Sequence, residues 1–512
     1  MNIINKTAYT FMKRRYRTVE RYMDDPHGVQ NKVLETLVKG GMGTEWGKKY
    51  HYSDIHSWDD FNRMVPVNTY ADLYPYILRI MHGENNLLWN EKVRWLAKSS
   101  GTTGKASKFI PVTGAALKQS HYKGGKEMVA IYCNMFADTH LFTGYNLALG
   151  GSRQSTPDTE LFCGDVSAIL MDNLPHWAEH FRFPKKEVAL MKEWETKLNA
   201  LVRSTYNKNI VSLSGVPSWM VLLLQKSVEY AGKKTVSEMW PNIETFFYGG
   251  VHFDPYRKKF DQLIGNTQMR YINIYNASEG FFGVQDQAHC SDMLLLLDNG
   301  IYYEFIPVEE ADQSHPSPIP LWKVEKGRNY AMVISTNSGL WRYIIGDTVT
   351  FTSLSPYRIQ ITGRTKNYIN VCGEELIVDN AIQALNLACN ELDCTVREFT
   401  AAPYFSHDEK PIGHQWLVEF ERTPTDTDLF ANTLDKKLQE VNTDYQSKRY
   451  KDLILHPLML TVAPQGTFMD WQRQRNRLGG QSKVPRLNNT REIIDPLLEI
   501  AEKVRNAEKV EN

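Results

Sequence analysis

The chain has 512 residues, of which 42% are hydrophobic and 23% charged, and its 59 Lys and Arg residues balance 59 Asp and Glu residues. This length allows two or more domains with a sizeable core, and the balanced charge favours neither a nucleic-acid partner nor a membrane surface. Six scattered cysteines without a CxxC pair are typical of reduced thiols, and the basic N-terminus lacks the apolar segment of a signal peptide. We therefore expect a cytoplasmic protein.

The first 95 residues predict amphipathic helices, and from about 93 to 285 strand-like and helix-like stretches alternate. A strand over 210–213 precedes a helix over 217–230, and a strand over 245–248 precedes a helix over 254–264. Such alternation predicts a parallel sheet that binds ligands at the carboxyl ends of its strands.

Short strands are expected between 293 and 362, and strands and helices mix again from 375 to 512, with a helix near 428–442. This change of pattern predicts a smaller second domain of the α+β class. We expect the boundary between Ser355 and Glu374, in a stretch that carries glycine and charge.

One loop combines hydroxyl groups, glycines and lysines. Ser99, Ser100, Gly101, Thr102 and Thr103 are followed by a second glycine and two lysines, the second of which is Lys108. Glycine lets backbone N–H groups turn toward a ligand, and each hydroxyl can donate a hydrogen bond, so the loop suits a polyphosphate. It is not a Walker A loop, because the two glycines are too close together. A surface turn rich in serine and glycine is the alternative.

Three further segments carry residue types suited to nucleotide chemistry. Glu279 follows a predicted strand that ends near Tyr275, and its carboxylate suits a Mg²⁺ ion on phosphates. Gly249 and Gly250 end the preceding strand and would let a flat ring approach the backbone. Asp347 follows a β-rich run and suits a ribose diol. Taken singly, Asp347 is equally consistent with a turn residue, and Glu279 with an acidic residue at a helix start.

The order of these segments resembles the adenylate-forming superfamily, and most closely its Gretchen Hagen three family of acyl-acid amido synthetases, first known as auxin-responsive proteins. The S-S-G-T-[ST] loop, which runs to a lysine and a proline, is matched through Lys108 and Pro111, and Y-x-x-S-E is matched at 275–279. Y-R-x-G-D is matched loosely, because Ile344 replaces the arginine and Arg342 lies one position before the tyrosine. Q-x-K-x-P-R is matched at 481–486, so the resemblance covers nearly the whole chain.

The resemblance implies an α/β fold with a large N-terminal domain over 1–365, which has mainly parallel sheets, flanking helices and a β-rich segment, and binds ATP and an acyl acid. A smaller, mobile α+β domain over 366–512 is the implied lid, with a hinge at 363–366. The implied activity is that of a ligase that forms an acyl-adenylate and then an amide with an amine, usually an amino acid. An acyl-CoA ligase, or a nucleotide-binding homologue without turnover, is the alternative.

The resemblance also implies roles for individual residues. The catalytic set is Lys483, which bridges the acid and the α-phosphate, with Glu279 as the Mg²⁺ ligand and Lys108. The loop over 99–103 holds phosphates and Asp347 the ribose. The remaining nucleotide-binding residues are Gly249, Gly250, Val251 and Tyr275 at the adenine, together with Asn276, Ala277, Ser278 and Arg364.

Overall fold

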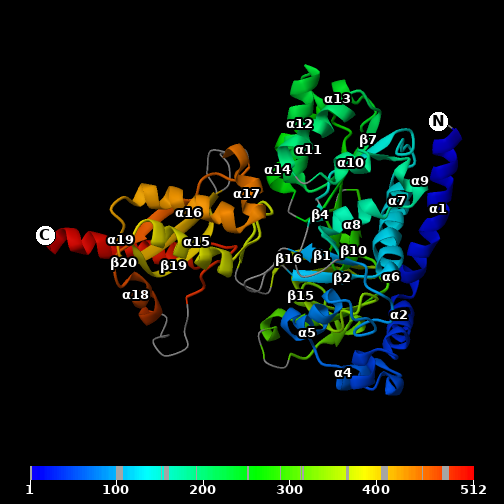
Figure 1. Ribbon diagram of the computed structural model, residues 1–512, viewed down its shortest axis with the longest axis horizontal. Coiled ribbons are helices and arrows are strands. Elements are labelled where there is room, and N and C mark those ends of the chain that lie inside the picture. Colours follow the sequence, from blue (N-terminus) through cyan, green and yellow to red (C-terminus); the bar gives the residue numbers. More distant parts are fainter. Residues whose placement is uncertain are drawn as a thin grey trace. The chain divides into compact units, whose positions relative to one another are not determined.

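A computed structural model describes residues 3–99, 108–151, 153–154, 161–191, 193–250, 253–288, 290–311, 313, 316–364, 368–404, 413–452, 454–474 and 484–511. The chain divides into two compact units (Figure 1), of which the first holds the described residues up to 364 and the second those from 368 onward. No helix in these ranges is long and apolar enough to cross a membrane.

A twelve-stranded sheet forms the centre of the first unit within the described residues, in the order β13-β12-β14-β15-β16-β11-β10-β9-β8-β7-β3-β6. At one end of this sheet, the neighbouring strands β6, β3, β7, β8 and β9 pair in parallel. All further neighbours in the sheet order, from β9 and β10 to β12 and β13, pair antiparallel. The expected parallel sheet and the expected β-rich segment are thus one continuous sheet. A second sheet has the order β2-β1-β5-β4.

The strands of the first unit have the following bounds: β1 (Trp95–Ser99), β2 (Lys108–Val112), β3 (Tyr145–Ala148), β4 (Arg153–Gln154), β5 (Phe162–Gly164), β6 (Arg182–Phe183), β7 (Ile210–Gly215), β8 (Thr245–Tyr248), β9 (Arg270–Ala277), β10 (Gly280–Gln285), β11 (Met293–Leu295), β12 (Ile301–Pro307), β13 (Ile319–Pro320), β14 (Asn329–Thr336), β15 (Tyr343–Leu354) and β16 (Tyr357–Arg364).

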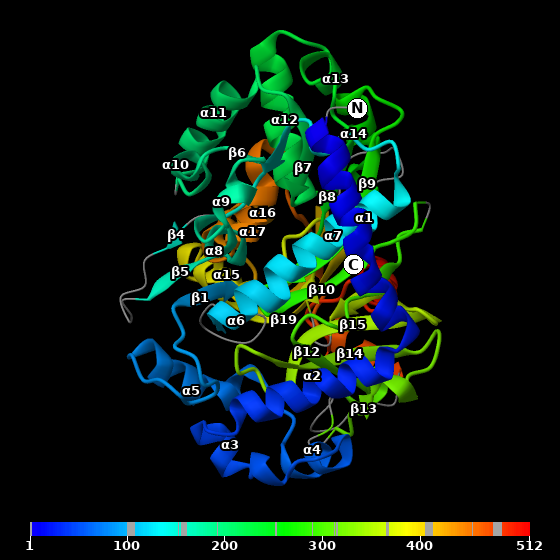
Figure 2. The same ribbon diagram turned by 90° about the vertical axis from the view of Figure 1, so that its right-hand side faces the viewer.

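The helices of the first unit pack their apolar faces onto these sheets. In Figure 2, α1 crosses α7 and α2 lies against β12. Their bounds are α1 (Ile3–Asp24), α2 (Pro26–Gly41), α3 (Glu45–Lys49), α4 (Trp58–Met64), α5 (Tyr70–Met81), α6 (Gly114–Ala116), α7 (Tyr122–Met135), α8 (Val166–Asp172), α9 (His176–Glu179), α10 (Lys186–Ala189), α11 (Trp194–Thr205), α12 (Pro217–Ala231), α13 (Val236–Met239) and α14 (Asp254–Ile264).

Local signals in the sequence explain where several of these helices begin and end. Pro217 starts α12, where its missing N–H costs nothing, and Gly232 ends it in the left-handed conformation with φ of 63°. The hydroxyl of Thr113 accepts from the backbone N–H of Ala116 and caps α6. A π-helical turn over Leu117–His121 joins α6 to α7, and such turns are frequent at functional sites.

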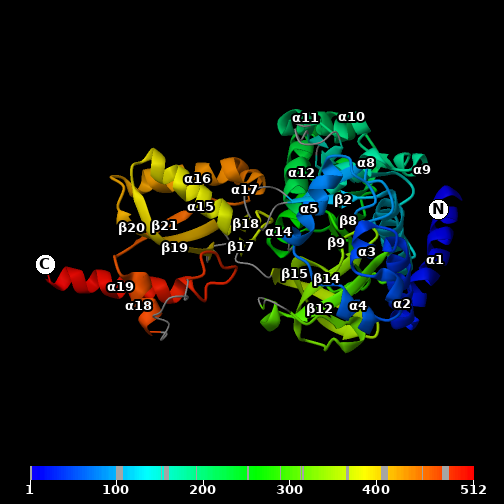
Figure 3. The same cartoon turned by 60° about the horizontal axis from the view of Figure 1, so that its bottom comes forward.

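The second unit is a layered α+β domain (Figure 3). Its three-stranded sheet has the order β19-β20-β21 within the described residues, with α15 and α16 on one face and α18 and α19 on the other. Both faces of β20 are buried, as expected for a strand between two helical layers. The bounds are β17 (Tyr368–Ile369), β18 (Leu376–Ile377), α15 (Val378–Glu391), β19 (Thr395–Tyr404), β20 (Gly413–Arg422), α16 (Thr427–Val441), α17 (Thr443–Arg449), β21 (Met459–Ala463), α18 (Thr467–Gln474) and α19 (Ile494–Glu511).

Candidate active site

Glycines occupy the carboxyl ends of three neighbouring parallel strands. Gly249 follows β8, Gly215 ends β7 and Gly150 follows β3. A Cβ at Gly249 would lie 2.4 Å from the carbonyl oxygen of Ile274 in β9, so close strand packing by itself requires this glycine. Gly250 has a φ of 82°, which favours glycine. The sequence pointed to Gly249 and Gly250, whereas Gly150 and Gly215 were recognised only once the strand order was known.

Tyr275 and Asp347, from two different sequence motifs, form a hydrogen bond. The Tyr275 hydroxyl donates to Oδ2 of Asp347 at 2.5 Å, and the two residues are 5% and 8% exposed. Tyr275 lies on β9 and Asp347 on β15, and β10, β11 and β16 separate these strands in the sheet. The sheet therefore curls far enough to bring two distant strands into side-chain contact.

Lys108 lies between two tyrosine rings. Its ammonium group is 3.2 Å from the hydroxyl of Tyr343, and 5.6 Å and 5.8 Å from the ring centres of Tyr70 and Tyr343. Lys108 is only 6% exposed, and a cation over an aromatic face is favourable. Burial raises the pKa of Tyr70 to about 12, so this phenol stays neutral beside the lysine at neutral pH. The arrangement holds a positive charge close to the start of β15.

His121, at the end of the π-helical turn, contacts Asn276 of the second motif. Its Nδ1 lies 3.1 Å from Oδ1 of Asn276, which can only accept, so the contact requires the Nδ1–H tautomer. Burial lowers the pKa of His121 to about 4, against the opposing effect of this hydrogen bond, and the imidazole is therefore neutral at pH 7. Sequence reasoning missed His121, because an isolated histidine near a helix start gives no local signal.

Glu279 lies in the tight turn between β9 and β10, and Ala277 pairs with Gly280 across this turn. Glu279 is 8% exposed. No group of three potential metal ligands occurs among the described residues. The carboxylate of Glu279 fits Mg²⁺, which is commonly bound by one or two carboxylates together with substrate phosphates.

The third motif departs from the family pattern, and Arg342 does not replace the missing arginine. Arg342 is 2% exposed and forms an ion pair with Glu304, with 2.9 Å between Nε and Oε2. Its backbone has a φ of 43°. Ile344, which stands at the motif position, is partly exposed. The buried guanidinium of Arg342 is thus occupied by a structural contact.

The predicted hinge begins beside Asp347. In the β15–β16 pair, Asp347 lies opposite Arg364, and Gly363 has a φ of 150°. Of Arg364 and Ser99 only the backbone is described. The following predicted residues lie outside the described residues: Ser100, Gly101, Thr102, Thr103, Val251, Lys366 and Lys483.

In the second unit, the described end of the last motif runs beside β19. The hydroxyl of Thr400 donates to the carbonyl oxygen of Pro485 at 2.8 Å. The backbone N–H of Ala401 donates to the carbonyl oxygen of Arg486 at 2.9 Å. The guanidinium of Arg486 lies 5.0 Å from the ring centre of Phe399. These contacts fix the segment that immediately follows Lys483 to the sheet of this unit.

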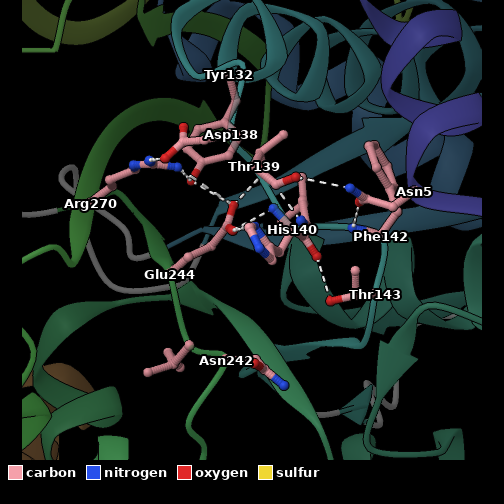
Figure 4. Close-up of polar contacts among 12 residues, drawn as sticks. Asn5, Tyr132, Asp138, Thr139, His140, Phe142, Thr143, Asn242, Glu244 and Arg270 are labelled. Carbon is pink, nitrogen blue, oxygen red and sulfur yellow. Dashed lines mark hydrogen bonds and ion pairs between the residues drawn. The ribbon is translucent and has the colours of Figure 1, made fainter. Parts of the chain in front are cut away.

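A separate polar network lies at the opposite, amino edge of the parallel strands (Figure 4). Glu244, just before β8, accepts from the hydroxyls of Tyr132 at 2.8 Å and of Thr139, and from the backbone N–H of His140 at 2.6 Å. Arg270 donates to the Tyr132 hydroxyl at 3.2 Å. These groups satisfy one another and join the end of α7 to β8 and β9, so we assign the network to folding.

Models of one protein family match three consecutive parts of the chain. Residues 15–269 match the GH3 family N-terminal domain, residues 294–364 the GH3 family central domain, and residues 379–492 the GH3 family C-terminal domain. The indole-3-acetic acid-amido synthetase GH3.3 of Arabidopsis thaliana is 22% identical, with 92% of this chain and 91% of that protein covered. The jasmonoyl-L-amino acid synthetase JAR4 of Nicotiana attenuata is 24% identical, with 87% of each covered.

Solved structures share the fold. The GH3.15 acyl acid amido synthetase superimposes with a TM-score of 0.59 at 19% identity, over 95% of this chain and 94% of that chain. A 2-hydroxyisobutyryl-CoA ligase superimposes with a TM-score of 0.56 at 14% identity, over 93% and 92%. The three matched domains, in order and over most of the sequence, show that this chain belongs to the GH3 family.

Proposed function

We propose that the protein is an ATP-dependent ligase that converts a carboxylic acid into an acyl-adenylate and then transfers the acyl group to an amine, in particular an amino acid. The observation that carries this proposal is that Lys108 and Tyr275 each contact a residue of β15. The residues in contact come from three separate sequence motifs: Lys108 donates to the hydroxyl of Tyr343, and Tyr275 donates to the carboxylate of Asp347. Membership of the GH3 family adds independent support.

In this proposal the nucleotide lies along the ends of β8, β9 and β15. Asp347 accepts the ribose hydroxyls, and the adenine lies beside Gly250, Val251 and the Tyr275 ring. The loop over 99–103 surrounds the phosphates. The backbone at 276–278 and the Arg364 side chain complete the site.

Charge neutralisation prepares the phosphates for reaction. Glu279 would hold Mg²⁺, which, when bound, offsets the negative charge of the phosphates. Lys108 adds a fixed positive charge that the rings of Tyr70 and Tyr343 keep in place. Lys483 would contact the acid and the α-phosphate, where negative charge develops during adenylation.

The proposed reaction has two steps. A carboxylate oxygen attacks the α-phosphorus of ATP, the bond to the bridging oxygen breaks, and pyrophosphate leaves. The amine nitrogen then attacks the acyl carbonyl carbon, AMP leaves with the former carboxylate oxygen, and the nitrogen loses a proton. Activation is needed because a free carboxylate is a poor electrophile, whereas AMP is a good leaving group. We further propose that residues 366–512 act as a lid that turns about 363–366 between the two steps.

The group that accepts the acyl chain distinguishes this function from that of an acyl-CoA ligase. One protein of the same fold is a 2-hydroxyisobutyryl-CoA ligase. The experiment offers the wild-type protein an acid that it adenylates, a mixture of amino acids and coenzyme A in one reaction. Mass spectrometry is expected to find an acyl-amino acid and no acyl-CoA. An acyl-CoA product without an amide would replace the proposed second step by thioester formation.

A further inference from the structure

Strand β9 is held from both faces at its carboxyl end. Tyr275 and Asn276 are consecutive, so their side chains point to opposite faces of the sheet. On one face Tyr275 donates to Asp347, and on the other Asn276 contacts His121. Both contacts are made between side chains of this chain, so the fold itself orders the carboxyl end of β9.

The position of the Tyr275 hydroxyl is fixed by packing. The Tyr275 ring lies 4.8 Å from the ring of Phe282, at a tilt of 57°, and the residue is 5% exposed. Asp347 comes from another part of the sheet, and the terminal torsion of an aspartate has a broad, roughly two-fold energy profile. A bond from a fixed hydroxyl to Oδ2 therefore selects one orientation of the carboxylate plane.

We propose that the Tyr275 hydroxyl is a positioning group for ribose recognition, because it holds the Asp347 carboxylate in the orientation that accepts both ribose hydroxyls. The proposal rests on the proposed function, in which Asp347 binds the ribose of ATP. A carboxylate oxygen can accept two hydrogen bonds, so the bond from Tyr275 is compatible with bonds from the sugar. Tyr275 then acts on the nucleotide in two ways, with its ring at the base and with its hydroxyl through Asp347.

The same strand offers a matched control. The hydroxyl of Tyr271, four residues earlier on β9, donates to Oδ1 of Asp261 at 2.8 Å. This second Tyr–Asp pair joins β9 to α14 and contains no residue of the three motifs. Tyr271→Phe therefore removes the same chemical group and the same kind of bond without touching the proposed site.

The test measures binding of ATP and of 2′,3′-dideoxy-ATP to the full chain by calorimetry. Tyr275→Phe is expected to weaken ATP binding about tenfold, the size of a lost hydrogen bond to a charged group. Binding of the dideoxy analogue is expected to stay within about twofold, because it lacks the hydroxyls that Asp347 accepts. Tyr271→Phe is expected to change neither. In an Asp347→Ala background, which leaves no acceptor for the tyrosine hydroxyl, Tyr275→Phe is expected to have no further effect on ATP binding.

For each variant, the affinities for ATP and for 2′,3′-dideoxy-ATP are measured on the same protein sample. A general loss of folded protein therefore affects both affinities equally and does not change their ratio. An equal weakening of both ligands in Tyr275→Phe, or no weakening of either, would overturn the inference while leaving the proposed function intact. Wild-type protein that binds neither nucleotide would overturn the proposed function, and the inference with it.

Discussion

The guanidinium of Arg342 forms a two-point ion pair with the carboxylate of Glu304, at 2.9 Å from Nε to Oε2 and at 2.9 Å from Nη2 to Oε1. The exposed fractions of the two residues are 2% and 1%. Arg342 also donates to the carbonyl oxygen of Val65 at 2.6 Å and to Oδ1 of Asn62 at 2.6 Å. One buried side chain thereby ties the end of α4 to β12 and to the start of β15, the strand that carries Asp347.

Arg342→Met is expected to lower the free energy of unfolding by about 3–5 kcal/mol, because it leaves the buried Glu304 carboxylate without its cation. Urea unfolding measures this loss. Arg63→Met, which removes the solvent-exposed pair with Asp60, serves as the control and is expected to change little. The folded fraction of Arg342→Met should still bind ATP normally. Lost ATP binding at unchanged stability would mean that Arg342 belongs to the nucleotide site.

Asp347→Ala is expected to weaken ATP binding, since a carboxylate that accepts ribose hydroxyls contributes about 1.5–3 kcal/mol for each bond. Calorimetry with ATP measures the change. Asp261→Ala is the matched control, because Asp261 also accepts from a tyrosine of β9 but lies outside the proposed site. Unchanged affinity in Asp347→Ala would exclude Asp347 from the nucleotide site.

Lys483→Ala is expected to bind ATP almost normally but to lose adenylation by about a hundredfold or more, because a cation at developing charge acts mainly in the transition state. Calorimetry and the rate of pyrophosphate exchange separate the two effects. Lys503→Ala, on the exposed side of α19, is the control for a general loss of positive charge. A wild-type exchange rate in Lys483→Ala would exclude this lysine from the reaction.

Glu127 is expected to make stability fall as the pH rises. It lies on α7 with no exposed surface, and neither carboxylate oxygen has a hydrogen-bond partner within the described part of the chain. Burial raises the pKa of Glu127 from 4.5 to about 7. Between these values the native state binds a proton that the unfolded state has lost, so stability decreases from about pH 4.5 to pH 7, by up to about 3 kcal/mol.

Urea unfolding over a pH series checks this slope by comparing wild type with Glu127→Gln, which has no such proton. His121 acts in the opposite direction, because burial lowers its pKa to about 4 and stability rises as the pH passes from that value to 6.5. The comparison cancels this contribution, which both proteins share. Glu502→Gln, at an exposed position of α19, is the control. Parallel pH profiles for wild type and Glu127→Gln would contradict the assignment.

Much of the local structure was predictable, because local signals determine it. The strand over Thr245–Tyr248 and the helix over Asp254–Ile264 were confirmed at both ends. The helix expected over 217–230 extends to Ala231, and the strand expected over 210–213 extends to Gly215. In each case the apolar pattern is strong, and a proline, a glycine or a turn marks the nearby boundary.

The contacts across the site were not predictable in the same way, because they depend on how the sheet curls. No period in the sequence indicates that Tyr275 of β9 meets Asp347 of β15, or that His121 lies against Asn276. In the third motif, Ile344 replaces the arginine and Arg342 lies one position before the tyrosine. The sequence alone therefore did not show whether Arg342 takes the place of the motif arginine. Only its burial against Glu304 assigns it to packing. Pairing between distant strands and the burial of charge are tertiary properties, so the motifs identified the candidate residues but not their partners.

Pyrophosphate exchange measures directly whether the chain activates a carboxylic acid with ATP. Wild-type protein is incubated with ATP, Mg²⁺, labelled pyrophosphate and one acid at a time from a broad aliphatic and aromatic library. Label is expected to enter ATP only when a suitable acid and Mg²⁺ are both present. If no acid supports exchange by a protein that still binds ATP, the chain is a nucleotide-binding homologue without turnover.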